Sequence, residues 1–352
     1  MGTRDDRIGQ ISRRLERLRE YSAAFTQATT SAAAVAGTLN DVRIRNVYVA
    51  LETPTTEGSD RRLPPRERRP PATRLVTPQG SLLRFSLVTL LEAQAGGTPP
   101  GARPRNIRSL VSRSGGSDTG WRDLFPTVAR VNNPGSPHRT TMRPREKVSL
   151  QLTNTLKRLA DTDLYEMVRF RDPSRRGMPR YENFELLHEG GRRPGGPNID
   201  YHVPDGAEAA FALPTEFFTR GWVYVLTENE IALLLAAAHK QSFHPPSDDK
   251  DEATGLWRLD GPQRISVYGL GPDAYNRHSF LEAVELLQVV PDPTRGANGR
   301  VSGIGERGGR TSKKDLLPHQ MRFLPEGLEH YAIPKVVDAL EAELDQLRHS
   351  GD

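Results

Sequence analysis

The chain has 352 residues, enough for two or three domains, and its 28 prolines and 31 glycines predict many loops. It has no cysteine, which excludes disulfides, thiolate zinc sites, iron–sulfur clusters and cysteine nucleophiles. The net charge is only +5 with a pI of about 9.5. The basic residues are almost all arginine, which suits bidentate contacts to phosphate and guanine but can equally reflect a GC-rich genome.

The hydropathy pattern gives no reason to expect a membrane protein. The longest apolar run, 231–238, is far shorter than the roughly 20 residues that span a bilayer. The first residues are charged rather than apolar, so we expect no secretory signal. The sequence therefore predicts a cytoplasmic protein with no membrane partner.

The N-terminal part of the chain divides into two segments. Residues 1–40 begin with a helical pattern, in which Ile8, Ile11, Leu15 and Leu18 recur at three- and four-residue steps. Residues 41–74 begin with a strand-like run, 42–51, and continue through a stretch rich in proline and arginine. That composition predicts a linker or a disordered arm.

Residues 75–190 form the first of two similar segments. An apolar helix is expected at 81–95, a short helical turn around Trp121, and a third helix, opened by Pro144, at 144–160. A strand at 164–168, an arginine-rich segment and a returning strand at 182–187 follow.

Residues 197–325 repeat this order. Helices are expected at 228–240, at 262–268 and, after Gly269, at 272–287; strands are expected at 288–290 and 319–324, with another basic segment between them. The junction of helix, glycine and helix is typical of a helix-turn-helix. The predicted fold is mainly α with small β-hairpin wings, in the α+β class, arranged as two tandem winged-helix domains plus terminal helices.

The second segment carries the clearest likeness to a known family. Tyr268, Gly269, Leu270 and Gly271 lead into 274–290, and Arg322, Phe323, Leu324 and Pro325 return. This arrangement resembles the winged-helix proteins of bacterial transcriptional regulators, and two such domains in one chain resemble plasmid replication initiators of the tandem winged-helix type. The resemblance is architectural, covers about 76–324, and implies binding to double-stranded DNA.

Residues 326–352 are expected to form a C-terminal helix that makes a homodimer. Its apolar residues alternate four and three positions apart, which is the spacing of a coiled-coil seam: Ile333, Val337, Leu340, Leu344 and Leu347. Such a seam needs a partner, and the basic N-terminal helix of the same chain or of a second copy is the natural candidate.

The residues expected to contact DNA fall on the two third helices and on the basic segments. Base contacts are expected from Arg145, Gln151, Asn154, Tyr275, Asn276 and Arg277. Backbone contacts around the first wing are expected from Arg143, Lys147, Arg158, Arg171, Arg175, Arg176 and Arg180. Those of the second wing are expected from Arg295, Arg300, Arg307, Arg310, Lys313 and Lys314. Arg169 belongs to the same basic run.

The sequence predicts a sequence-specific DNA-binding protein of the nucleoid rather than an enzyme, with no metal and no cofactor. A transcriptional regulator is the first interpretation; a replication initiator or partition-like factor would use the same chemistry. An interaction protein whose winged helices bind other proteins is the alternative of another class. The run Gly303 to Gly308 spells a dinucleotide fingerprint, but it lacks the helix that should follow.

Overall fold

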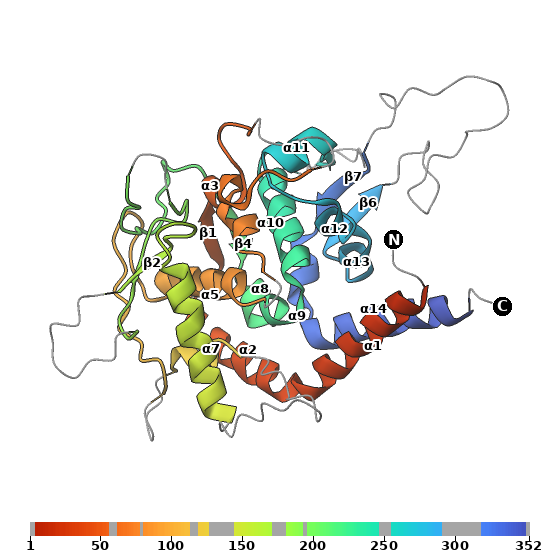
Figure 1. Cartoon of the computed structure of the whole chain (residues 1–352), viewed down its shortest axis with the longest axis horizontal. Helices are drawn as coiled ribbons and strands as arrows, with labels where there is room; N and C mark the ends of the chain where they lie inside the picture. Colours follow the sequence, from red (N-terminus) through yellow and green to blue (C-terminus); the bar gives the residue numbers. More distant parts are fainter. Residues whose placement is uncertain are drawn as a thin grey trace. The chain divides into compact units, whose positions relative to one another are not determined.

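The computed structural model describes residues 4–55, 62–77, 80–112, 119–126, 144–170, 181–192, 196–245, 255–290 and 318–349. These residues form mainly helices with small antiparallel sheets (Figure 1), which confirms the α+β class. Within them, β1 pairs with β4, β2 pairs with β3, and β7 lies between β5 and β6.

The contacts divide the chain into two compact units. The first unit comprises Met1–Arg45, Leu75–Glu228 and Leu328–Asp352, and the second comprises Asn46–Arg74 and Asn229–Gly327. Each of the two similar segments thus lies mainly in its own unit. The terminal helices belong to the first unit, and the segment expected to be a linker belongs to the second.

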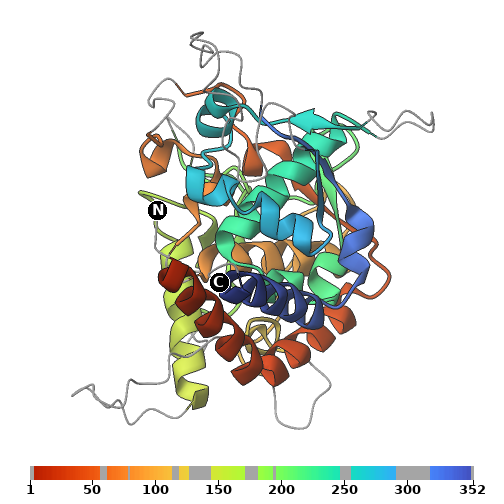
Figure 2. The ribbon, with the colours of Figure 1, turned by 90° about the vertical axis from the view of Figure 1, so that its right-hand side faces the viewer.

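The terminal helices of the first unit pack on each other. Helix α1 (Arg4–Glu20) lies beside α14 (Ala332–His349), and α2 (Ser22–Ala36) continues from α1 (Figures 1 and 2). Arg4 donates hydrogen bonds to the last carbonyls of α14, Leu347 O at 2.6 Å and Arg348 O at 2.8 Å. A cation at that end offsets the negative end of the helix dipole.

One helix begins later than expected, and one helix was not expected at all. Helix α14 begins at Ala332 because a 3₁₀ turn, η3 (Pro325–Glu329), precedes it. Helix α2 was not expected, because its buried stripe is made mostly of small residues, which give a weak periodic signal: Phe25, Ala28, Ala32 and Ala36.

Helix α5 (Leu82–Ala95) is the centre of the first unit. It contacts α2, α7, α9 (Trp222–Val225) and β1, which explains why it is apolar nearly all round. At α6 (Trp121–Leu124), Trp121 packs 5.5 Å from Phe85 and 5.1 Å from Phe184, measured between ring centroids. This aromatic cluster holds α6 and the residue before β3 against α5.

The first sheet is closed by a buried ion pair. Strand β1 (Asp41–Arg45) runs antiparallel to β4 (Ala210–Pro214), which precedes α8 (Glu216–Thr219). The chain turns into α3 (Asn46–Val49) where the sequence predicted more strand. The Arg45 guanidinium lies 2.8 Å from Glu189 Oε2, and the two side chains are 6 % and 0 % exposed.

The remaining elements of the first unit follow the predicted order. Helix α7 (Pro144–Leu159) packs on α5, and β2 (Val168–Arg169) pairs antiparallel with β3 (Glu185–Leu186) (Figure 1). The third helix is therefore confirmed, and an antiparallel strand pair follows it, but the strand predicted at 164–168 is wrong in its bounds: residues 162–165 form a turn and β2 begins only at Val168.

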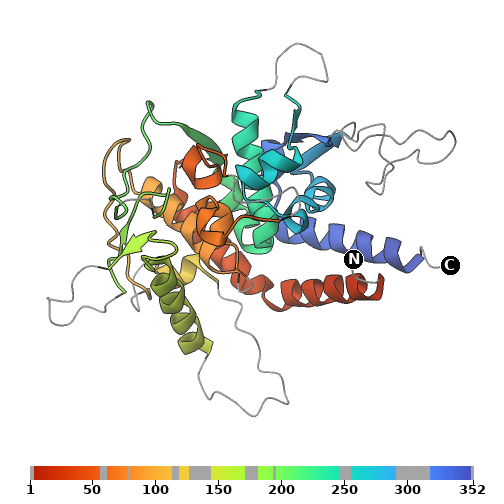
Figure 3. The same ribbon diagram turned by 45° about the horizontal axis from the view of Figure 1, so that its top comes forward.

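The second unit is built on the buried helix α10 (Glu228–Ser242). Along the chain follow β5 (Trp257–Arg258), α11 (Gly261–Ser266), α12 (Pro272–Tyr275), α13 (His278–Ala283), β6 (Leu287–Val290) and β7 (Gln320–Phe323). Strand β6 contacts α13 and pairs with β7 (Figure 3). Gln241 Oε1 accepts from Trp257 Nε1 at 3.1 Å and Phe323 N at 3.0 Å, which fixes the sheet to the end of α10.

The single helix expected at 272–287 is two short helices instead. Glu285, with a φ of 61°, adopts the left-handed conformation, which ends helical geometry and turns the chain into β6. Gly327 lies against this turn: a Cβ there would stand 2.0 Å from Glu285 O, so only glycine fits. Strand β5 was not expected, because two residues carry too little pattern.

Much of the expected linker is packed structure. Residues 62–77 include the 3₁₀ turn η1 (Arg66–Arg68) and α4 (Pro71–Arg74), and α4 is buried. Thr73 Oγ1 donates to Tyr268 O at 2.9 Å, beside Gly269, whose φ is +63°. The proline-rich composition is therefore that of a fixed turn rather than a free linker in this part; residues 56–61 lie outside the description.

Candidate nucleic-acid interface

Helix α7 has one buried face and one outward face. Leu152, Leu156 and Leu159 are buried, as the periodicity predicted. The opposite side carries exposed residues: Glu146, Leu150, Asn154 and Lys157. Lys147, Gln151 and Arg158 are half-buried along the flank of this face.

Several of the predicted contact residues on α7 are available for a ligand. The side chains of Lys147, Gln151 and Asn154 have no hydrogen-bond or ion-pair partner among the described residues. The side chain of Arg145, and the whole of Arg143, lie outside the description. The predicted set omitted Leu150 and Lys157, although a helical wheel centred on the buried leucines places both on the outward side.

An aromatic pair at the base of the β2–β3 hairpin connects it to α7. The rings of Phe170 and Tyr181 meet edge to face at 5.3 Å. Lys157 of α7 places its ammonium 5.6 Å from the Tyr181 ring centroid, within reach of a cation–π contact. The outward face of α7 is thus held next to the two residues between which the arginine-rich segment runs. Sequence reasoning missed this pair, because nothing in the pattern joins 170 to 181.

The arginine nearest the hairpin is already paired. Arg169 Nη2 lies 2.6 Å from Glu185 and 2.8 Å from Asp200, and Arg103 pairs with the same two acids. The hydrogen bond that Arg169 donates to the Glu185 carboxylate is the main cause that raises the pKa of Arg169. Two cations and two anions cancel here, so Arg169 does not belong to the phosphate-contacting set in which the sequence placed it.

The corresponding surface of the second unit lies at the junction of α12 and α13. Asn276 is exposed and Arg277 is half-buried, and neither side chain has a partner among the described residues. Both side chains are therefore accessible to a ligand, and their contact with bases stays a prediction. Tyr275 is not: its side chain is only 9 % exposed and packs 4.8 Å beneath the Arg264 guanidinium. Burial leaves Tyr275 little surface for a base, so it belongs to the core.

Contacts between tilted rings join this junction to the second hairpin. His278 lies 5.2 Å from Tyr275 and 5.4 Å from His319, the residue before β7. His319 is buried, at 7 % exposed. As in the first unit, ring contacts hold the helical surface beside the strand that follows the basic segment.

The predicted wing residues themselves are not part of the described structure. They are Arg171, Arg175, Arg176 and Arg180 of the first segment, and Arg295, Arg300, Arg307, Arg310, Lys313 and Lys314 of the second. Their placement in the interface rests on sequence alone, as does the fingerprint-like run from Gly303.

The seam of the last helix already has an occupant within the same chain. Leu340 and Leu344 are 2 % and 7 % exposed, and the facing surface of α1 buries Ile11, Leu15 and Leu18. Ile333, Val337 and Leu347 are half-buried. Of the two partners expected for this seam, the N-terminal helix of the same chain is the one present. The buried stripe of α14 is Ala332, Val336, Leu340 and Leu344, so Leu340 and Leu344 are the two predicted seam positions that belong to it.

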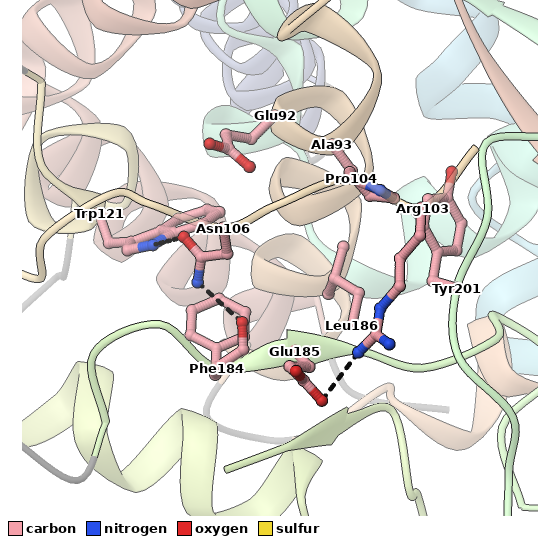
Figure 4. Close-up of a pocket in the computed structure, with 10 residues that line it drawn as sticks. All are labelled: Glu92, Ala93, Arg103, Pro104, Asn106, Trp121, Phe184, Glu185, Leu186 and Tyr201. Carbon is pink, nitrogen blue, oxygen red and sulfur yellow. Dashed lines mark hydrogen bonds and ion pairs between the residues drawn. The ribbon is translucent and has the colours of Figure 1, made fainter. Parts of the chain in front are cut away.

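The first unit contains a small pocket lined by residues of α5, α6 and β3 and of the segments beside them (Figure 4). Arg103 and Glu185 meet on one side, while Asn106 bonds Phe184 O at 3.0 Å and Trp121 Nε1 at 3.2 Å on the other. Burial raises the pKa of Glu92, and the nearby Arg108 offsets this in part. The cavity of about 20 Å³ holds no more than a water-sized group, so it offers no room for an organic cofactor.

The described residues contain neither a metal-binding cluster nor a membrane-spanning helix. No group of three or more histidine, aspartate or glutamate side chains is placed to hold a metal ion. No helix there combines the length and the apolar character needed to cross a membrane. No protein-family model, no curated protein and no solved structure matches this chain.

Proposed function

We propose that the protein binds double-stranded DNA through two winged-helix units, one in each compact unit. The observation that carries the proposal is the element order of the second unit. Helices α10, α11 and α12–α13 are followed by β6, a basic segment and β7, with β6 and β7 paired antiparallel. Apart from the two-residue strand β5, which lies between α10 and α11 and pairs with β7, this is the order helix, helix, helix, strand, basic loop, strand of a winged helix. The order α5, α6, α7, β2, β3 in the first unit supports the same interpretation.

Charge and side-chain chemistry support DNA as the ligand. Each third helix presents amide and cationic groups that have no partner among the described residues, Lys147 and Asn154 in one unit and Asn276 and Arg277 in the other. The segments between the paired strands are rich in arginine, with four among residues 171–180 and four, with two lysines, among 291–317. Such residues bind phosphates, while amide and guanidinium groups on a helix read base edges in the major groove.

Transcriptional regulation is the role we propose first, and replication initiation or partition is the alternative that uses the same DNA contacts. The alternative of another class is a protein-binding module, in which the same surfaces meet a protein partner. Salt dependence separates the two classes, because only a polyanion releases condensed counterions when it is bound.

The test is the affinity for a labelled duplex of random sequence, measured by fluorescence anisotropy at several salt concentrations. If roughly six to ten phosphates are contacted, affinity should fall by about 10³–10⁵ between 50 and 200 mM salt. The double variant Lys147→Ala/Lys157→Ala should bind more weakly and show a smaller salt slope. Arg13→Ala removes an exposed charge from α1, away from this surface, and serves as the matched control.

A second measurement separates base from backbone contacts. On a preferred site selected from random duplexes, Arg277→Ala should cost about 1–3 kcal/mol and relax sequence choice. Arg307→Ala/Arg310→Ala should weaken all sequences alike. An affinity that is absent at low salt or insensitive to salt would refute the DNA-binding proposal and favour the protein-binding module.

A further inference from the structure

Leu150 is an apolar residue on the polar side of α7. Its side chain is 47 % exposed, while the leucines of the opposite face are buried in the first unit. A single exposed leucine is ordinary on a protein surface. What distinguishes Leu150 is its position, one helical turn before Asn154 and beside Lys147, at the centre of the surface proposed to face DNA.

Leu150 and Asn154 are placed to act together. Four residues advance an α-helix by about 6 Å, and the two side chains lie on one face. Base pairs are stacked about 3.4 Å apart, so the two residues would meet bases one or two pairs apart. The Asn154 amide offers one donor and one acceptor side, and it has no partner among the described residues.

Base edges in the major groove have one match for each of these side chains. The amide of asparagine can bond adenine N6 and N7 in a bidentate way, whereas an apolar side chain fits the methyl group of thymine. A leucine has no hydrogen-bonding group and gains nothing from the polar edges of guanine or cytosine. The pair therefore matches adenine and thymine.

We propose that α7 reads A·T pairs, with Asn154 on an adenine and Leu150 against the methyl group of a thymine within two base pairs of it. This inference rests on the proposed DNA-binding function and adds the base composition that the first unit selects. Charge favours DNA over a protein as the occupant of this face: Lys147 and Lys157 outnumber its one carboxylate, Glu146, and an arginine-rich run follows Phe170 in the sequence.

The test uses the preferred duplex selected from random sequences. Each thymine is replaced in turn by deoxyuridine, which removes only the methyl group. At one position the full-length wild type should lose about fourfold in affinity, the effect of one buried methyl-sized group. Leu150→Ala should show no loss at that position. Ile199→Ala, which shortens another exposed apolar side chain of the first unit, should keep the wild-type sensitivity.

Asn154 is tested in the same way with 7-deazaadenine, which removes the N7 acceptor. The wild type should lose affinity at one adenine within two base pairs of the sensitive thymine, and Asn154→Ala should not. A protein that binds the selected duplex but treats every thymine and deoxyuridine alike would overturn the inference while leaving DNA binding intact. A protein that binds no duplex at low salt would overturn the proposed function, and the inference with it.

Discussion

At the scale of single residues, two buried polar groups should control the stability of the units. Arg45 is 5 % exposed, and its backbone N and guanidinium both donate to Glu189, at 2.5 and 2.8 Å. The same guanidinium reaches Glu208 and His202 O. Burial raises the pKa of Glu189 to about 7, although Arg45 opposes the rise. Each charge therefore offsets the cost of burying the other.

Removing one partner should cost much more than removing both. Arg45→Met leaves a buried carboxyl without its cation, and we expect a loss of about 3–5 kcal/mol in the free energy of unfolding. Arg45→Met/Glu189→Leu should lose less, because no isolated charge remains. The Arg45→Met variant should also be more stable at pH 5 than at pH 8, because the buried Glu189 carboxyl is protonated, and so uncharged, at pH 5. Urea unfolding of both variants checks this; equal losses would mean that the pair is not coupled.

In the second unit, His239 should make stability depend on pH. Its ring is 6 % exposed, with Nδ1 2.9 Å from the Tyr268 hydroxyl, and burial lowers its pKa to about 4. The unfolded chain takes up the proton near pH 6.5, whereas the folded chain resists until about pH 4. The contribution of the uncharged His239 ring to the free energy of unfolding is therefore complete above pH 6.5. It is lost as the pH falls, by up to about 3 kcal/mol near pH 4.

His239→Phe should flatten the pH dependence of urea unfolding between pH 6.5 and 4. His244→Gln, at an exposed position after the same helix, should leave the wild-type slope unchanged. Parallel slopes for wild type and His239→Phe would show instead that His239 takes up its proton over the same pH range in the folded and the unfolded chain.

At the scale of elements, periodicity predicted those segments whose burial is one-sided and whose ends are marked. Helices α5, α7 and α10 and the paired strands β6 and β7 lie close to where the sequence placed them. It failed where the signal is small or comes from tertiary contacts. Helix α2 is buried through alanines, β5 has two residues, and residues 62–77 are ordered by contacts such as Thr73 to Tyr268.

The candidate interface divides in the same way. Exposed polar residues on a helix, such as Asn154 and Asn276, can be inferred from the face opposite the buried one. Ion pairs and ring contacts between distant segments cannot. Arg169 was expected to be free because Glu185 and Asp200 lie 16 and 31 residues away in the chain. Tyr275 was expected at the surface because its partner Arg264 lies on another helix.

The pairing of α1 with α14 leads to a prediction about the last helix. Replacing Leu340 and Leu344 by Asp puts two charges into an apolar contact within one chain. We expect the free energy of unfolding to fall by several kcal/mol, because buried unpaired carboxylates are strongly unfavourable. Ala342→Asp, on the exposed side of α14, should change it little. Chemical unfolding and sedimentation velocity together provide the test.

The competing interpretation of this helix predicts a different outcome. If the seam joined two copies, the wild type would sediment as a dimer and the double variant would be a monomer of unchanged stability. That result would show that α14 mediates dimerisation, as its heptad spacing suggested. The apolar seam of α14 would then be covered by a second copy and not by α1 of the same chain.

At the scale of the whole molecule, the proposed function makes the two units a linked pair of DNA readers. Once one unit is bound, the other is held near the same duplex, so its binding becomes intramolecular. A duplex of about 10 base pairs, one helical turn, should engage one unit, whereas one of about 30 base pairs should admit both. Linkage of this kind raises affinity by about 10²–10⁴ without any new type of contact.

Duplex length and variants of each unit therefore test whether both units bind together. For the wild type, we expect the 30-base-pair duplex to bind at least about 100-fold more tightly than the 10-base-pair duplex at equal salt. The variant Asn276→Ala/Arg277→Ala, in the second unit, should lose most of this preference for the longer duplex. The variant Lys147→Ala/Asn154→Ala, in the first unit, should lose most of it as well. Combining all four substitutions should weaken binding to both duplexes and leave almost no ratio. If instead the variants of one unit lower the affinity while those of the other leave the ratio intact, a single unit binds DNA and the second surface has another partner.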